Sequence, residues 1–433
     1  MARSLNVVIV ASELPYPPTA GGRIRTLNLT LRLARRHCIT FIAHRNDESD
    51  EAVRLLRGHG IETLLVDRSI PPKSGLGFYI RLSANLASPL PYSVASHDSR
   101  LLRREIADRA QRPGVVDLWQ MESTVLFDML AQVDDAPKIV MAPNVETLIW
   151  QRYWEVEPNP LRGWYIKRQW RKFRRFERRT FAAANQVVTV SDQDAERVAS
   201  EFQAARPEVV ENGVDTSFFR PLGEDREPAH ILFLGSLDWR PNLDAVNSLL
   251  SKIFPAVRAI EPTAHLSLVG RHPPEWLAQE VQKQPGVSLN GDVTDVRPFL
   301  ARCGQLVVPL RIGGGSRLKI LEALACETPV VSTRIGAEGL HLENGRHLHV
   351  VESVEDMAGA ILRCIRNPTA AQTQARLGRR VVLDRYDWDG LADKLEQIWL
   401  SCAHMRTSKA GALGSEVQSA RFEMHAPSAK FAR

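Results

Sequence analysis

Short apolar segments alternate with helical segments along most of this chain, and that alternation limits the possible fold more than any other feature. Runs such as Asn6–Ala11, Cys38–His44 and Ala229–Gly235 have the length of buried strands. Arg23–Arg36 and Asn242–Ile260 are predicted to be helices between such runs. Strand–helix alternation is typical of parallel, doubly wound sheets with helices on both faces. We therefore predict an α/β protein.

The length of 433 residues predicts two or three domains. Val209–Pro221 contains an Asn-Gly turn and ends on proline, which favours a connector between two α/β units. From His404 onward, small and basic residues occur without periodicity, as in disordered tails. The predicted organisation is a first domain over 1–210, a hinge over 211–221, a second domain over 222–384, a C-terminal helix over 385–403 and a disordered basic tail over 404–433.

The composition excludes a membrane span and a disulfide framework. Apolar runs such as Leu5–Ala11 are far shorter than the roughly 18 to 20 residues that a spanning helix needs. The cysteines are odd in number and show no metal-like spacing, which favours reduced thiols in a cytoplasm: Cys38, Cys303, Cys326, Cys364 and Cys402. A net charge of +6 permits anionic partners such as nucleotide-sugars, anionic lipid or nucleic acid.

A glycine run before a helix carries the strongest chemical signal, within Arg311–Leu340. Glycines let a ligand approach the backbone closely, and the helix start behind them presents free N–H groups and a positive dipole end. Two cations add formal charge, and a carboxylate one turn further can accept hydrogen bonds from sugar hydroxyls. The predicted residues are Gly313, Gly314, Gly315, Ser316, Arg317, Lys319 and Glu322. Together they predict a site for a phosphorylated ligand.

The segment GGGSRLKILEALACETPVVST resembles the donor-binding signature of the retaining GT-B glycosyltransferases of family 4, which transfer sugars from nucleotide-diphosphate donors. That family usually carries two glutamates separated by seven residues. Glu322 matches the second, which typically holds the donor ribose. Gly314 stands where the first would touch the transferred sugar, as in a branch with a Gly-rich loop there. The resemblance spans roughly 5–402 and implies a GT-B fold: two Rossmann-like domains face a cleft, and the C-terminal helix crosses back onto the first.

Loops after other strands supply further candidate donor contacts. The family commonly has Gly-Arg and a later Lys after the first strand of its second domain, where this chain has Gly235, Ser236 and, as the nearest cation, Arg240. We infer that Arg240, Arg317 and Lys319 together neutralise the diphosphate. In the family, backbone near the position of Gly291 meets the nucleobase; a plain strand-to-helix turn is an equal alternative.

The first domain offers a glycine pair and two polar residues that follow strands. Gly21 and Gly22, with Arg25 behind them, open a helix that the resemblance places beside the donor phosphates or the acceptor, although a plain turn would look the same. Asn144 and Glu146 stand about where family members often have a histidine near the transferred sugar. Glu146 could orient or deprotonate the acceptor hydroxyl, or simply be a surface cap.

Segment Arg162–Arg179 concentrates Arg and Lys around a stripe of Trp170, Phe173 and Phe176. Three interpretations stay open: a core-facing helix with a solvated basic face, peripheral contact with an anionic membrane, and nucleic-acid binding. The resemblance favours the membrane, because many such transferases act on lipid-linked acceptors. No module signature supports nucleic acid, so we predict no nucleic-acid partner.

The resulting prediction is a hexosyl-type transferase that uses a nucleotide-sugar and a glycan or lipid-linked acceptor with retention, in polysaccharide or exopolysaccharide biosynthesis. No Asp-x-Asp pair lies in a loop suited to a metal ion, so we expect neither a metal nor another cofactor. The predicted location is the cytoplasm, at the inner face of the plasma membrane where lipid contact occurs. The alternatives are a GT-B-type UDP-sugar epimerase or phosphorylase, and a catalytically silent nucleotide-sugar-binding scaffold.

Overall fold

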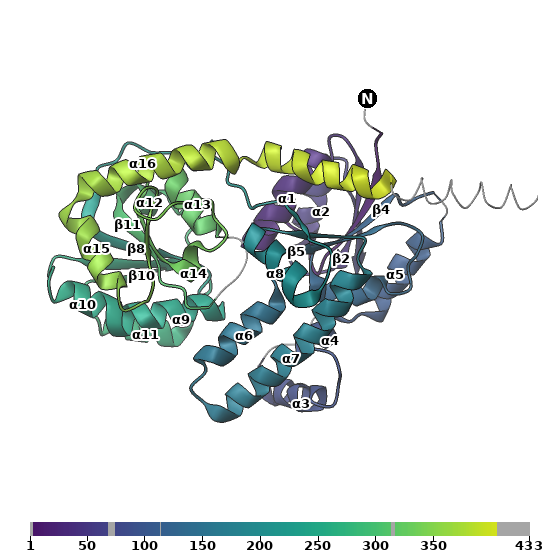
Figure 1. Ribbon diagram of the computed structural model, residues 1–433, viewed down its shortest axis with the longest axis horizontal. Helices are drawn as coiled ribbons and strands as arrows, with labels where there is room; N and C mark the ends of the chain where they lie inside the picture. Colours follow the sequence, from purple (N-terminus) through teal and green to yellow (C-terminus); the bar gives the residue numbers. More distant parts are fainter. Residues whose placement is uncertain (1–2, 68–73, 113, 313–316, 405–433) are drawn as a thin grey trace, which may run out of the picture.

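The computed structural model describes residues 3–67, 74–112, 114–312 and 317–404. They form two α/β domains that lie side by side (Figure 1). All recorded strand pairs are parallel, as the alternation of strands and helices predicted. Gly313–Ser316, the predicted glycine run, lies outside the described residues.

The first domain is built on a seven-stranded sheet in the order β3-β2-β1-β4-β5-β6-β7. Val7 of β1 pairs with Ile39 of β2 on one side and with Leu118 of β4 on the other. The order in which strands are added therefore reverses between β1 and β4: β2 and β3 lie on one side, and β5, β6 and β7 lie on the other. Doubly wound folds bind ligands at such a point. The strands are β1 (Asn6–Val10), β2 (Cys38–His44), β3 (Glu62–Val66), β4 (Leu118–Met121), β5 (Lys138–Ala142), β6 (Gln186–Thr189) and β7 (Glu208–Val209). The helices are α1 (Gly21–Leu33), α2 (Ser49–Gly58), α3 (Gly75–Asn85), α4 (Tyr92–His97), α5 (Arg100–Ala110), the 3₁₀ segment η1 (Thr124–Leu130), α6 (Glu146–Val156), α7 (Pro160–Ala183) and α8 (Asp192–Phe202).

The second domain has a six-stranded sheet in the order β10-β9-β8-β11-β12-β13, with an extensive apolar core. The strands are β8 (Glu227–Leu234), β9 (His265–Gly270), β10 (Val287–Gly291), β11 (Cys303–Val308), β12 (Val330–Thr333) and β13 (His349–Val351). The helices are α9 (Arg240–Ser248), the π segment η2 (Leu249–Ile253), α10 (Phe254–Arg258), α11 (Glu275–Gln282), α12 (Arg297–Arg302), α13 (Leu318–Ala325), α14 (Arg334–Ala337), α15 (Met357–Arg366) and α16 (Pro368–Arg385).

The predicted single helix Asn242–Ile260 is instead three consecutive helical segments, α9, η2 and α10. Pro255 stands in the first turn of α10 and has no N–H to donate to a preceding carbonyl. A missing bond of that kind favours a locally wider turn, which accounts for the π segment before it.

The chain returns to the first domain at its C-terminal end. Residues 388–404 are helical and lie across the first domain (Figure 1), where Trp388, Leu395 and Trp399 join the core cluster that includes residues of β1 and β4. The Trp399 indole donates a hydrogen bond of 2.7 Å to Gln120 Oε1, at the penultimate position of β4. The connector is held by the same helix, since a Cβ on Gly213 would lie 2.6 Å from the Trp388 ring. The predicted tail lies outside the described residues except for His404.

Trp388→Ala should destabilise the first domain by about 3–5 kcal/mol, because Trp388 is 1% exposed and its removal leaves a cavity at the core. Urea unfolding followed by circular dichroism measures the change. Trp164→Ala is the matched control, since that side chain is 57% exposed and its loss should shift stability by less than about 0.5 kcal/mol. Equal unfolding midpoints for the two variants would show that the C-terminal helix does not stabilise the domain.

The basic segment Arg162–Arg179 lies within the single helix α7 (Pro160–Ala183). Asn159 caps it, accepting hydrogen bonds from the Leu161 and Arg162 amides. Phe173 and Phe176 face the core, and Trp170 stacks on Trp154 of α6. The aromatic stripe therefore packs inside the protein, and the exposed arginines form the opposite face. Among the described residues, no helix has the length and apolar character needed to cross a membrane.

Candidate functional site

Lys319 is the second residue of α13, and its side chain reaches the carboxyl end of β8. Its Nζ donates a 3.0 Å hydrogen bond to Asn242 Oδ1 and lies 4.9 Å from the centre of the Phe233 ring. A Cβ on Gly235 would come within 2.9 Å of the same nitrogen. The structure thus brings Lys319 together with the predicted residue Gly235, where a side chain would displace Lys319 or Asn242.

Lys319 and Glu322 lie three residues apart, within one turn of α13, and burial shifts the pKa of both side chains. Burial lowers the pKa of Lys319 to about 7, while the carboxylate of Glu322 opposes that shift. Burial raises the pKa of Glu322 to about 7, opposed by the charge on Lys319. An anion bound beside Lys319 would favour the protonated amine, so the site is electrostatically suited to a phosphate group.

Arg317 is held by a carboxylate that the sequence interpretation did not include. Its guanidinium Nη2 lies 3.4 Å from Glu338 Oε2, and its Nε donates to the Glu338 carbonyl at 3.2 Å. Arg152 of α6 donates to both Glu338 carboxylate oxygens at 2.8 and 3.0 Å. Burial lowers the pKa of Arg317 to about 10, and Glu338 opposes the shift. A first-domain arginine therefore contributes to the cation cluster of the second domain.

Arg240 contacts the first domain rather than the Lys319 group. Its guanidinium donates to Glu157 Oε2 at 2.8 Å and stacks over the Tyr153 ring at 4.4 Å. In this structure Arg240 and Arg317 each form an ion pair with a carboxylate, so a bound diphosphate would have to replace those carboxylates. The joint role predicted for Arg240, Arg317 and Lys319 stays a prediction, and it now requires Arg240 to leave Glu157.

The remaining predicted donor contacts lie at or just after the carboxyl ends of strands. Ser236 donates a hydrogen bond of 2.6 Å to Asp238 Oδ1. Gly291 is the last residue of β10, and a Cβ there would come within 3.0 Å of Pro273. A cavity of about 460 Å³ elsewhere, between residues 221–228 and α16, contains none of the predicted residues.

Glu146 is the first residue of α6, a helix of the first domain that contacts the second domain. Ile149, one turn after Glu146, packs with Ile312, the residue immediately before Gly313. Burial raises the pKa of Glu146 to about 8, and the carboxylate of Glu177 adds to the shift. Near-neutral pKa values of this kind are typical of carboxyl groups in acid–base catalysis. Asn144 lies two residues earlier and is partly exposed.

The buried carboxylate of Glu177, which the sequence interpretation missed, positions Glu146. It accepts hydrogen bonds of 2.9 Å from the amides of Glu146 and Thr147, and one of 2.6 Å from the Thr147 hydroxyl. An acceptor on these amides caps the start of α6. Burial raises the pKa of Glu177 to about 7, opposed by its hydrogen bonds with Thr147.

A cavity of about 200 Å³ opens at the carboxyl ends of β1, β4 and β5 in the first domain. Gly22, Arg25 and Glu122 line it, and a Cβ on Gly22 would meet no atom within 4 Å. Glu122 accepts hydrogen bonds from the Thr26 hydroxyl and from Gln120 Nε2, the latter at 2.6 Å. Gly21 is the first residue of α1, and Glu122 is a cavity residue that the sequence interpretation missed.

The predicted role of Arg25 in the cleft loop stays a prediction, and the structure shows that this side chain is buried and bonded with the connector. Its Nη1 donates to the Glu211 carbonyl at 2.6 Å and to Asn212 Oδ1 at 3.3 Å. Burial lowers the pKa of this guanidinium to about 10. Arg25 thus fastens α1 to the connector, and it also lines the cavity, with its Nη2 buried and without a hydrogen-bond partner.

Comparison with known proteins supports one assignment for both domains. Residues 228–367 match the family model "Glycosyl transferases group 1", and residues 19–218 match "Glycosyltransferase Family 4". The chain is 25% identical over 316 residues to the glycogen synthase of Mycobacterium tuberculosis, covering 69% of this chain and 72% of that protein. The sucrose-phosphate synthase of Thermosynechococcus elongatus superposes with a TM-score of 0.68 at 18% identity, covering 91% and 98% of the two chains. Anabaena HepE, solved in complex with UDP and glucose, gives a TM-score of 0.63 at 14% identity, covering 92% and 100%.

Proposed function

Because this chain is a glycosyltransferase of GT-B fold, we propose that it moves a hexosyl group from a nucleotide-diphosphate donor to a glycan or lipid-linked acceptor, with retention of anomeric configuration. The observation that carries the proposal is the group of Arg317, Lys319 and Glu322 at the start of α13, directly behind the glycine run. Polysaccharide biosynthesis is the setting we propose, by analogy with the glycogen synthase relative.

The proposed donor position follows from charge. A diphosphate over α13 would meet Lys319 and Arg317 together with the free N–H groups of the helix start. As the sugar departs, negative charge grows on the nucleoside diphosphate, and preorganised cations stabilise that charge. We propose that these groups make a metal ion unnecessary, and that Glu322 holds the donor ribose.

The proposed acceptor position is the first-domain cavity. Glu122 and Arg25 line it with a carboxylate and a guanidinium group, and Gly22 leaves space, a combination that suits sugar hydroxyls. Glu146 would orient or deprotonate the attacking hydroxyl from the neighbouring α6. Attack on the face from which the diphosphate leaves would give retention.

Product analysis tests this proposal. The protein is incubated with UDP-, GDP-, dTDP- and ADP-sugars and a panel of glycan and polyprenol-linked acceptors, and products are examined by NMR. Transfer with the anomeric configuration of the donor is the expected result. Inversion would refute the retaining mechanism. Donor binding without transfer to any acceptor would favour the silent scaffold, and a changed sugar without acceptor would indicate an epimerase; the family matches favour neither alternative.

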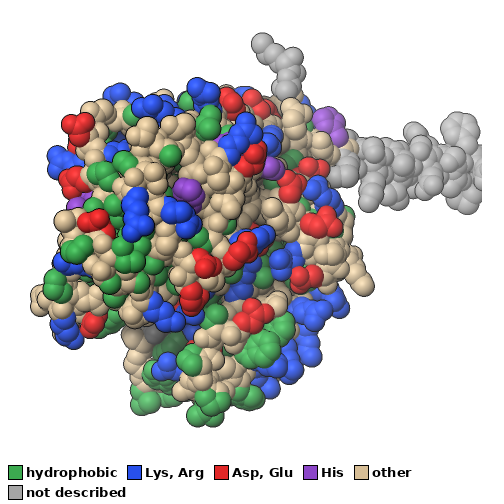
Figure 2. All heavy atoms as spheres, turned by 60° about the vertical axis from the view of Figure 1, so that its left-hand side comes forward, with side chains coloured by type: hydrophobic (Ala, Val, Ile, Leu, Met, Phe, Trp, Pro, Cys, Tyr) green, Lys and Arg blue, Asp and Glu red, His purple; other side chains and the backbone are tan. Residues whose placement is uncertain are grey.

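We also propose peripheral contact with an anionic membrane, through α3 and the start of α7. Five large apolar side chains there are 57 to 80% exposed: Leu76, Tyr79, Ile80, Leu161 and Trp164. The two helices are fastened to one another, since Gln169 and Lys172 of α7 both bond with Asn85 of α3. The helices α3 and α7 form the lower end of the molecule in Figure 1. Figure 2 shows hydrophobic side chains gathered at the lower end, with Lys and Arg beside them. Apolar insertion flanked by basic residues is the usual chemistry of such contact.

The variant Leu76→Asp/Ile80→Asp should bind phosphatidylglycerol-containing vesicles at least about 100-fold more weakly, since each of the two buried apolar side chains contributes about 1.5–3 kcal/mol. Vesicle co-sedimentation measures the difference. Ile260→Asp is the control, because Ile260 is 57% exposed but belongs to the second domain. Unchanged binding of the double variant would refute this surface as the membrane contact.

A further inference from the structure

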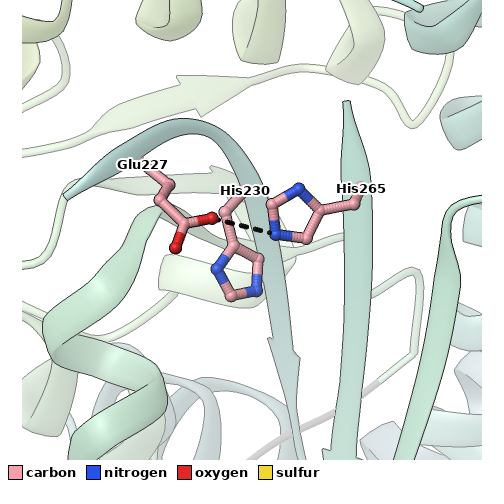
Figure 3. A group of neighbouring side chains, drawn as sticks. All are labelled: Glu227, His230 and His265. Atoms are coloured by element: carbon pink, nitrogen blue, oxygen red, sulfur yellow. Dashed lines mark ion pairs between the residues drawn. The ribbon is translucent and has the colours of Figure 1, made fainter. Parts of the chain in front are cut away.

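Two histidines and a glutamate converge at the amino end of the second sheet. Glu227 and His265 are the first residues of β8 and β9, and parallel pairing sets His230 directly opposite His265. Figure 3 shows the three side chains pointing toward one another. One nitrogen of each ring and one carboxylate oxygen lie within 4.8 Å of one another. Within the described ranges, no other group of His, Cys, Asp and Glu meets this criterion.

His230 has the features of a preformed metal ligand. Its side chain is buried, its Nε2 lies 2.8 Å from the Ser267 hydroxyl, and its Nδ1 is buried without a hydrogen-bond partner. Unpaired buried nitrogens are rare because they forfeit hydration. With Nε2 hydrogen-bonded to Ser267, Nδ1 is the ring nitrogen left available to a metal ion, and a hydrogen-bonded partner on the other ring nitrogen is typical of metal-bound histidines.

His265 and Glu227 supply the accessible half of the cluster. His265 Nε2 lies 3.4 Å from Glu227 Oε2, and the two side chains are 40% and 59% exposed. The two imidazole rings are stacked, with centres 4.1 Å apart and planes 25° apart. Metal–ligand bonds of roughly 2.0–2.2 Å require the His265 ring to turn out of this stack. Its exposure permits that rotation and gives an ion a path from solvent.

We propose that Glu227, His230 and His265 bind a Zn²⁺ ion, with water completing the coordination. Two imidazoles and one carboxylate favour a borderline ion such as Zn²⁺ over Mg²⁺ or Ca²⁺, which prefer oxygen ligands alone. The cluster lies at the opposite end of β8 from Gly235 and Lys319, roughly 20 Å away at about 3.3 Å per residue. The ion would therefore take no part in sugar transfer; it would join the ends of β8 and β9 and stabilise the second domain.

Zinc titration of the full chain, prepared without a polyhistidine tag and treated with chelator, tests this site. Calorimetry should give one Zn²⁺ per chain, and Co²⁺ should show the visible absorption of a four-coordinate nitrogen–oxygen site. His265→Ala and Glu227→Gln should each lower zinc affinity at least about ten-fold, and zinc should raise the melting temperature of the wild type only.

His59→Ala is the matched control, because His59 is an exposed histidine of the first domain and its loss should leave zinc affinity unchanged. The partly exposed His265 is preferred to the buried His230, since its replacement leaves the core intact. Zinc binding that is absent in the wild type, or equally tight in His265→Ala, would overturn the proposal.

Discussion

Replacement of Lys319 by methionine is expected to weaken binding of the donor nucleoside diphosphate about 10- to 150-fold, because one charge-assisted hydrogen bond contributes about 1.5–3 kcal/mol. Methionine keeps much of the side-chain volume beside Phe233 and Gly235, so the variant should fold. Isothermal titration calorimetry gives the affinities. Lys252→Met is the control, because Lys252 is an exposed lysine of the same domain whose nearest carboxylate, Glu355, is 3.8 Å away.

The lowered pKa of Lys319 adds a pH dependence with a definite sign. With a pKa of about 7, the amine is largely neutral at pH 8 in the free protein. A bound diphosphate favours the ammonium form, so binding at pH 8 should take up a proton, and affinity should fall as pH rises from 6 to 9. Calorimetry in buffers of different ionisation enthalpy measures the uptake. Proton uptake that persists in Lys319→Met would assign the titration to another group.

Glu146→Gln is expected to lower the turnover number about 10²- to 10⁴-fold while leaving the donor KM nearly unchanged, as removal of a general base does. The pKa of Glu146 is raised to about 8, and a base must be ionised. The wild-type rate should therefore rise with pH up to about 8, and the variant should lose that rise. Initial-rate assays over pH 6 to 9 measure both effects.

Glu155→Gln on the same helix is the control, since Glu155 is exposed and bonds only locally with Gln151. Full activity of Glu146→Gln would show that this residue is merely the acidic first residue of α6. A loss of activity without any change in the pH profile would instead make Glu146 a residue that positions the acceptor.

The fold followed from local sequence patterns, and the same patterns predicted that Lys319 lies near the start of a helix. Apolar strands that alternate with helices require a parallel sheet, and the position of Lys319 follows from a helix directly after a glycine run. Short or exposed elements gave no such signal. The helix α3 carries Leu76, Tyr79 and Ile80 on its surface, so no core-facing pattern marks it. The three-residue strand β13 is too short to show a period.

The groups that complete the site could not be predicted, because each comes from a distant element. Glu338 meets Arg152 from 186 residues away, and Glu177 caps α6 from about 30 residues further along the chain. Glu122 follows β4 as an isolated acid without a motif. His230 and His265 lie 35 residues apart, and only strand pairing makes them neighbours. Such pairs are set by tertiary packing, which leaves no local spacing in the sequence.

Binding of UDP, GDP, dTDP and ADP to the wild type and to Lys319→Met, measured by calorimetry, tests the central claim most directly. The expected result is preferential binding of one nucleotide, with that affinity reduced at least about ten-fold in Lys319→Met and retained in Lys252→Met. Absence of binding by the folded wild type to all four nucleotides, or equal affinity in Lys319→Met, would contradict a donor diphosphate site at the start of α13.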